Sequence, residues 1–72
     1  MPSKYPVMKP NEVIERLEQF GFYYVSQRGS HRKYTNGTRS FVIPMHDEIA
    51  KGTLKSILAQ ANVSLEQFLE VM

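Results

Sequence analysis

The chain has 72 residues, enough for one domain with a thin core, because proteins this small bury only about 60% of their unfolded surface. It has no cysteine, which excludes disulfides and zinc-binding thiolates, and no apolar run approaching the ~18 residues of a membrane span. Since the first residues lack the apolar core of a signal peptide, we expect a cytoplasmic protein without membrane contact.

Positive charge is concentrated in the middle of the chain. Segment 22–45 contains four basic residues and no acidic one, a charge of +4, whereas the whole chain carries +2, so the other residues sum to −2. Such a local excess is typical of phosphate-binding surfaces, although a solvated face explains the charge alone equally well. The basic residues are Arg28, Arg32, Lys33 and Arg39.

The first predicted element is a helix over 10–20, preceded by a lead-in segment over 1–9. Pro6 and Pro10 disfavour helix in the lead-in, whereas proline suits the first turn of a helix. Apolar residues recur at positions 13, 14, 17 and 20, which is one stripe of a helix, and Gly21 suits its end.

Three strands are predicted next. Aromatic and β-branched residues over 22–25 indicate the first strand, and a turn follows at 28–30. Segments 31–35 and 38–43 flank Asn36-Gly37, the dipeptide most typical of a two-residue type I′ hairpin turn.

This turn predicts a register and therefore two faces. It would pair Thr35 with Thr38 and continue to His31 opposite Val42. Because cross-strand partners share a face, one face would carry Tyr34, Phe41 and Ile43 and must be the core side. His31 and Lys33 would then share the open face of the sheet.

The last third is predicted to be helical. Leu54, Ile57, Leu58 and Ala61 form one stripe, Asn62 tolerates a left-handed stop, and a capping box at 64–67 opens a short terminal helix. The order is α-β-β-β-α plus a short C-terminal helix: an α+β domain with a three-stranded antiparallel sheet and its helices on one face.

The segment Gly29–Tyr34 carries the most suggestive chemistry, a single histidine among cations. Histidine suits proton transfer near neutral pH, and neighbouring Arg and Lys compensate the charge of a phosphodiester. Together they are the minimum for cleaving RNA without a metal: a base removes the 2′-OH proton, and that oxygen attacks the adjacent phosphorus. On local spacing alone, His31 could equally be an ordinary surface histidine.

His46 stands beside the acidic pair Asp47-Glu48. These three residues could form a metal site, but a polar loop explains them as well. We therefore expect no metal and no cofactor. His46 is also a candidate general acid for the leaving group.

Four spaced motifs and the tail of the chain resemble the HicA toxin family: Glu12–Phe22, Gly29–Tyr34, Val42–His46, Lys51–Leu58 and Asn62–Leu69. The resemblance implies a single domain over 1–72 with a fold similar to double-stranded-RNA-binding domains. It also implies the toxin of a type II toxin–antitoxin module, an mRNA endoribonuclease that needs no ribosome. Its partners would be mRNA and a HicB-type antitoxin, which covers the active surface, and no direct DNA binding is expected.

The resemblance makes His31 the catalytic histidine of a Gly-Ser-His motif. Candidate RNA contacts are Lys33, Arg28, Arg39, Arg32 and Lys51. Lys33 is the strongest because it shares the face of His31, and Arg32 is the weakest because it points to the other face. Tyr23 or Tyr24 is a candidate for stacking on a base, since strand alternation sends one of them outward.

Two other readings stay open at this point. The chain could be a non-catalytic RNA-binding module that grips RNA by shape, or a protein-interaction domain with no role in nucleic-acid binding. Cleavage of RNA that survives a chelator and requires His31 would separate the enzyme from both.

Overall fold

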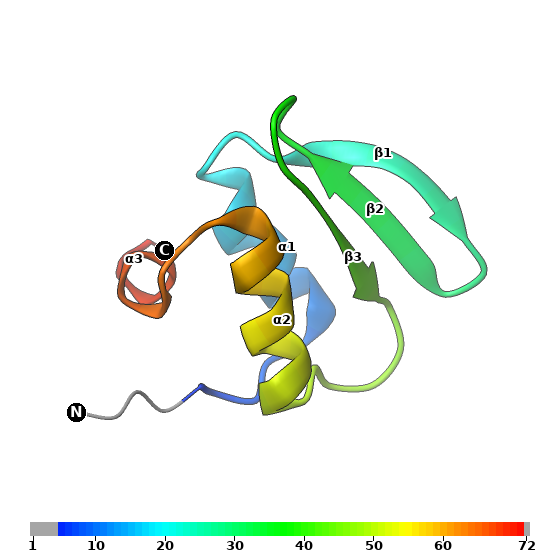
Figure 1. Cartoon of the computed structure of the whole chain (residues 1–72). Coiled ribbons are helices and arrows are strands. Elements are labelled where there is room, and N and C mark those ends of the chain that lie inside the picture. Colours follow the sequence, from blue (N-terminus) through cyan, green and yellow to red (C-terminus); the bar gives the residue numbers. More distant parts are fainter. Residues whose placement is uncertain (1–4, 72) are drawn as a thin grey trace.

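The computed structural model describes residues 5–71 and contains three helices and three strands within that range (Figure 1). Their order confirms the α-β-β-β-α arrangement followed by a short helix. The elements are α1 (Pro10–Glu18), β1 (Tyr23–Arg28), β2 (His31–Thr35), β3 (Ser40–Pro44), α2 (Lys51–Ala61) and α3 (Leu65–Glu70).

The lead-in packs against the fold through Met8 and through Tyr5, which is half-buried against the core. Met8 is buried and forms an isolated antiparallel bridge with Ile49, whose amide donates to the Met8 carbonyl at 2.6 Å. Residues 1–4 of the expected lead-in lie outside the described residues. Helix α1 begins at Pro10, and the Glu12 carboxylate accepts a hydrogen bond from the Lys9 amide at 3.1 Å, which is half of a capping box.

The strands form an antiparallel sheet in the order β1-β2-β3. The predicted two-residue turn at Asn36-Gly37 is wrong: Thr35 pairs with Ser40, so the loop between β2 and β3 has four residues. Asn36 keeps a negative φ, and its side-chain oxygen accepts hydrogen bonds from the amides of Thr38 and Arg39. This side-chain-capped loop takes the place of the type I′ turn.

The tight turn lies instead between β1 and β2. Arg28 pairs with His31, which leaves only Gly29 and Ser30 in the connection, and Gly29 adopts a φ of +60°. The register predicted for β2 and β3 is off by two residues. Because successive side chains of a strand point to opposite faces, a shift of two residues leaves each side chain on its predicted face. Tyr34, Phe41 and Ile43 are therefore buried on one face as predicted, and His31 and Lys33 are exposed on the other.

Helix α2 packs on β3, and α3 packs against α1. The buried residues of α1 and α2 are the predicted apolar ones, and Asn62 ends α2 in the left-handed region. Ser64 and Gln67 form the predicted capping box of α3. Residues 65, 68, 69 and 72 have the spacing of one apolar stripe of a helix, but Leu69 on α3 is exposed, and Met72 lies outside the described residues.

The helices leave β1 uncovered. All six residues of this edge strand are exposed, and Figure 1 shows the turn between β1 and β2 projecting away from the helices. No helix within residues 5–71 is long and apolar enough to cross a membrane.

Candidate active site on the open sheet face

One face of the sheet carries no helix, and the register arranges its side chains in three rows across the strands. Starting at the end of β2 next to the β2–β3 loop and ending next to the β1–β2 turn, the rows are Tyr23–Thr35–Ser40, Ser26–Lys33–Val42 and Arg28–His31–Pro44. We call these nine residues the open face, and all of them are exposed or half-buried.

A bulge in β1 decides which of its residues belong to this face. The pairing shifts between Tyr24 and Ser26, so that Val25 is an extra residue. Tyr23 before the bulge and Arg28 after it consequently lie on the same face, although strict alternation along the chain would separate them. The bulge therefore brings Arg28 to the face of His31.

His31 lies in a shallow depression of about 500 Å³. The depression is lined by Ser26, Arg28, His31, Lys33 and Val42. Two cations thus flank one exposed imidazole, and segment 22–45, which supplies every residue of the depression, contains no carboxylate. The residues that line the depression therefore present positive charge and no carboxylate to an anion that reaches His31.

The structure brings His46 next to His31. Their ring centroids are 6.3 Å apart in an edge-to-face arrangement. The backbone explains this proximity, because the Met45 amide continues the ladder beyond β3 and donates to the Ser30 carbonyl at 2.6 Å. The Asp47 carboxylate lies 3.5 Å from His46 Nδ1, an ion pair when the imidazole is protonated.

The acidic pair after His46 does not form a cluster of three ligands with it. Within residues 5–71, no three His, Cys, Asp or Glu side chains are close enough together to hold a metal ion. His46 and Asp47 approach each other as a pair, without Glu48 joining them.

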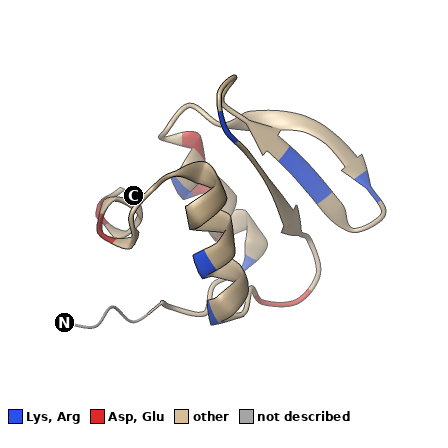
Figure 2. Ribbon diagram, in the orientation of Figure 1, with Lys and Arg blue, Asp and Glu red and all other residues tan. Residues whose placement is uncertain are grey.

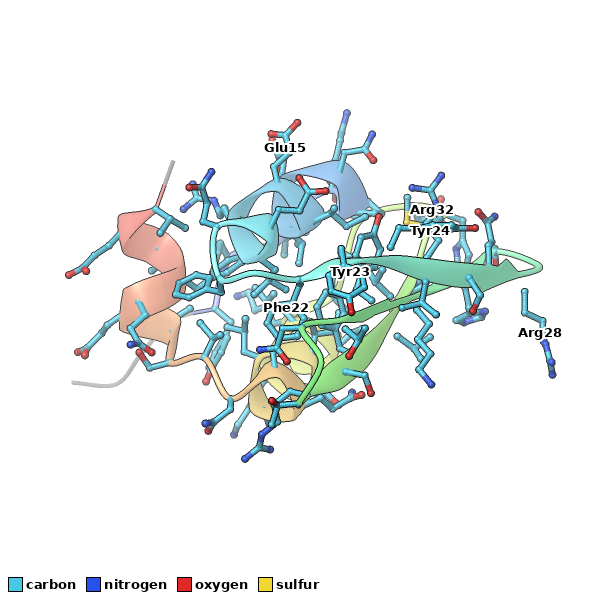
Figure 3. The ribbon with its side chains drawn as sticks, turned by 90° about the horizontal axis from the view of Figure 1, so that it is seen from above. Glu15, Phe22, Tyr23, Tyr24, Arg28 and Arg32 are labelled. Atoms are coloured by element: carbon cyan, nitrogen blue, oxygen red, sulfur yellow. The ribbon has the colours of Figure 1, made fainter. Side chains whose placement is uncertain are left out.

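Arg32 lies on the opposite face of the sheet from His31. Its Nε donates to Gln27 Oε1 at 3.0 Å, and its guanidinium carbon lies 5.7 Å from the centre of the Tyr24 ring. Figure 3 shows Arg32 and Tyr24 together on one side of β1, while Arg28, near the turn, points to the other side. Arg32 therefore does not line the depression at His31, whereas Arg28 and Lys33 do.

Arg39 and Lys51 also lie away from His31. Arg39 is in the loop at the other end of β2, beside Phe20, Asn36 and Asn62. Lys51 is the first residue of α2, on the helix side of the sheet. Figure 2 shows basic positions on the strands and their loops, on α2, and on and beside α1, whereas acidic positions lie on α1, α3 and the loop after β3.

Sequence reasoning missed two features of this site. It did not place His46 beside His31, because the contact depends on how β3 continues past Pro44. It did not place Arg28 on the open face, because a bulge leaves no clear pattern in the residues of β1. Only the correct register could have shown it, because His31 pairs with Pro44 and His46 lies two residues beyond that partner.

The arrangement offers proton transfer next to charge compensation for an anion. Two imidazoles are close enough to contact one phosphodiester group, and two cations stand beside them. The fold and this site define a class: a small α+β domain with a basic, histidine-bearing sheet face that is exposed.

Comparison with known families specifies the class further. A family model described as the HicA toxin of bacterial toxin–antitoxin systems matches residues 10–63. Because the match covers more than half of the chain, the protein belongs to the HicA toxin family. No curated protein matches the chain. Family membership implies an antitoxin partner.

Proposed function

We propose that this toxin is an endoribonuclease that cleaves mRNA without a metal and without the ribosome, with His31 as general base. The observation that carries the proposal is the exposed His31 imidazole between Arg28 and Lys33, with His46 at 6.3 Å. Metal-independent cleavage of RNA needs a base, an acid and cations around one phosphate, and these residues supply each of them.

The chemistry follows from these roles. His31 removes the proton from a 2′-OH, and the 2′-oxygen attacks the adjacent phosphorus. The bond between phosphorus and the 5′-oxygen breaks, and His46 gives that oxygen its proton. The products are a 2′,3′-cyclic phosphate and a free 5′-OH. Lys33 and Arg28 compensate the charge that develops on the non-bridging oxygens.

The open face also suggests how the toxin is silenced. It is shallow and unobstructed, so one protein surface can cover His31 and both cations at once. We propose that a HicB-type antitoxin binds over this face and excludes RNA from it. The protein would act in the cytoplasm, as a single domain over residues 1–72.

Incubation of purified protein with single-stranded RNA in EDTA tests the nuclease proposal. Wild-type protein is expected to cleave, His31→Ala is expected to lose cleavage, and an unchanged thermal unfolding curve of the variant serves as its fold control. A substrate with one 2′-deoxy nucleotide at the cleaved position should resist cleavage there. Binding without cleavage, equal in wild type and His31→Ala, would establish the non-catalytic RNA-binding reading instead.

Growth of bacteria that express the protein tests the toxin proposal separately. Expression of wild type should arrest growth, and co-expression of an antitoxin encoded next to it should relieve the arrest. Growth arrest by His31→Ala as strong as that by wild type would contradict the link between toxicity and cleavage.

A further inference from the structure

Two adjacent tyrosines on β1 have different environments. Tyr23 and Tyr24 are similarly exposed, at 55% and 52%. Tyr24 is nevertheless engaged: its ring lies edge-to-face with Tyr34 at 6.0 Å, and Arg32 lies over it at 5.7 Å. Tyr23 pairs with Thr35 and therefore projects from the open face, the face that carries His31.

Tyr23 lies in line with the candidate site. Thr35, its cross-strand partner, is four residues from His31 along β2, a distance of about 13 Å at ~3.3 Å per residue. Lys33 lies between them on the same face. The open face thus presents, in order along β2, an imidazole, an ammonium group and an aromatic ring.

This order matches the chemistry of an extended RNA strand. A phosphodiester backbone follows cations, and an unpaired base stacks on an exposed aromatic ring. The ring is on the uncovered edge strand, where a base can approach without moving a helix. The other residues of its row, Thr35 and Ser40, are small and polar, so they leave the Tyr23 ring accessible to a base.

We propose that Tyr23 is a stacking platform for one nucleobase of a single-stranded RNA, a few nucleotides from the phosphate that His31 cleaves. This proposal rests on the proposed function and specifies its substrate: the toxin grips an unpaired strand of several nucleotides laid along β2. Tyr24 has no part in this contact, because its ring is on the opposite face.

Cleavage kinetics of matched variants test the proposal. With a single-stranded RNA of about ten nucleotides, Tyr23→Ala should raise KM about 5- to 30-fold and leave kcat unchanged, since stacking on an aromatic side chain holds a base at this order of strength. Tyr23→Phe should restore the wild-type KM because it keeps the ring, whereas Tyr23→Leu should not. Tyr24→Ala is the control and should leave KM within twofold.

A short substrate sharpens the kinetic test. A dinucleotide occupies the site at His31 but does not extend about 13 Å to Tyr23. Tyr23→Ala and wild type should therefore cleave it equally. If Tyr23→Ala cleaves the dinucleotide and the longer RNA with the same loss of kcat/KM, Tyr23 acts on the catalytic site or on the fold, and the platform is overturned.

A binding measurement keeps this inference separate from catalysis. The chain has no tryptophan, so Tyr23→Trp introduces a single fluorescent reporter at the proposed platform. In a His31→Ala background, single-stranded RNA should quench that fluorescence by stacking, and Tyr24→Trp in the same background should change little. Equal responses at both positions would contradict the proposal.

The outcomes distinguish the two proposals. If wild type fails to cleave RNA but Tyr23→Trp is quenched by it, the proposed function fails and the platform stands as a binding site. If wild type cleaves but Tyr23→Ala is as active as wild type on the longer RNA, the platform fails and the function stands. Loss of inhibition by antitoxin in Tyr23→Ala, with unchanged RNA cleavage, would assign the ring to the protein interface and overturn the platform.

Discussion

Replacing Arg16 with methionine is expected to destabilise the protein through the C-terminal helix. Arg16 Nη1 donates to the backbone carbonyls of Phe68, Leu69 and Val71 at 3.1, 3.2 and 2.9 Å. Its guanidinium carbon lies 5.5 Å from the centre of the Phe68 ring. Because α3 has only six residues, it is too short to persist without tertiary contacts, and Arg16 satisfies carbonyls that the helix end leaves free.

The magnitude follows from the number and exposure of these bonds. A hydrogen bond that involves a charged group contributes about 1.5–3 kcal/mol. Nη1 carries two hydrogens, so its three contacts are worth at most about two bonds, and water replaces part of them because the Leu69 carbonyl is exposed. Methionine keeps the apolar stem over Phe68. Two such bonds would contribute about 3–6 kcal/mol if they were fully buried; because solvent compensates most of this at the partly exposed helix end, we expect a loss of about 1–2 kcal/mol, or a fall in Tm of roughly 4–16 °C for a domain of this size.

Urea and thermal unfolding followed by circular dichroism measure this loss. Arg39→Met is the matched control: Arg39 is exposed in the loop after β2, and its replacement should change the free energy of unfolding by less than about 0.5 kcal/mol. Hydrogen exchange should also show faster exchange of α3 amides in Arg16→Met. If Arg16→Met is as stable as the Arg39→Met control, the anchoring of α3 by Arg16 is refuted.

Two further predictions concern the proposed active site. His46→Ala should lower kcat about 100-fold and leave KM within about twofold, because the leaving 5′-oxygen then lacks its proton donor; an unchanged kcat in His46→Ala would contradict the assignment of His46 as general acid. Lys33→Ala should raise KM for RNA about tenfold and reduce the salt dependence of binding by about one counterion, whereas Lys51→Ala, on the helix side of the sheet, should leave both nearly unchanged. If Lys33→Ala and Lys51→Ala change KM and the salt dependence of binding equally, RNA also contacts the helix side of the sheet.

Local chemistry accounts for most of the fold that could be predicted. The stripe of α2, the left-handed stop at Asn62 and the capping box at Ser64 depend on residues within one or two turns of each other, and each is present in the structure. The predicted faces of β2 and β3 were also correct although the predicted turn was wrong, because the register was off by an even number of residues. The turn itself failed because Asn36 satisfied the loop amides with its side chain, an alternative that the Asn-Gly dipeptide does not exclude.

The sequence by itself determined the element order, the buried face of the sheet and the exposure of His31 beside Lys33, since these follow from the periods of helix and strand. Only the tertiary structure decided which other groups join them. The bulge at Val25 placed Arg28 and Tyr23 on the open face, and the continued ladder from Met45 to Ser30 placed His46 beside His31. These contacts depend on the register between strands, and that register is set by the packing of the whole sheet rather than by any one segment.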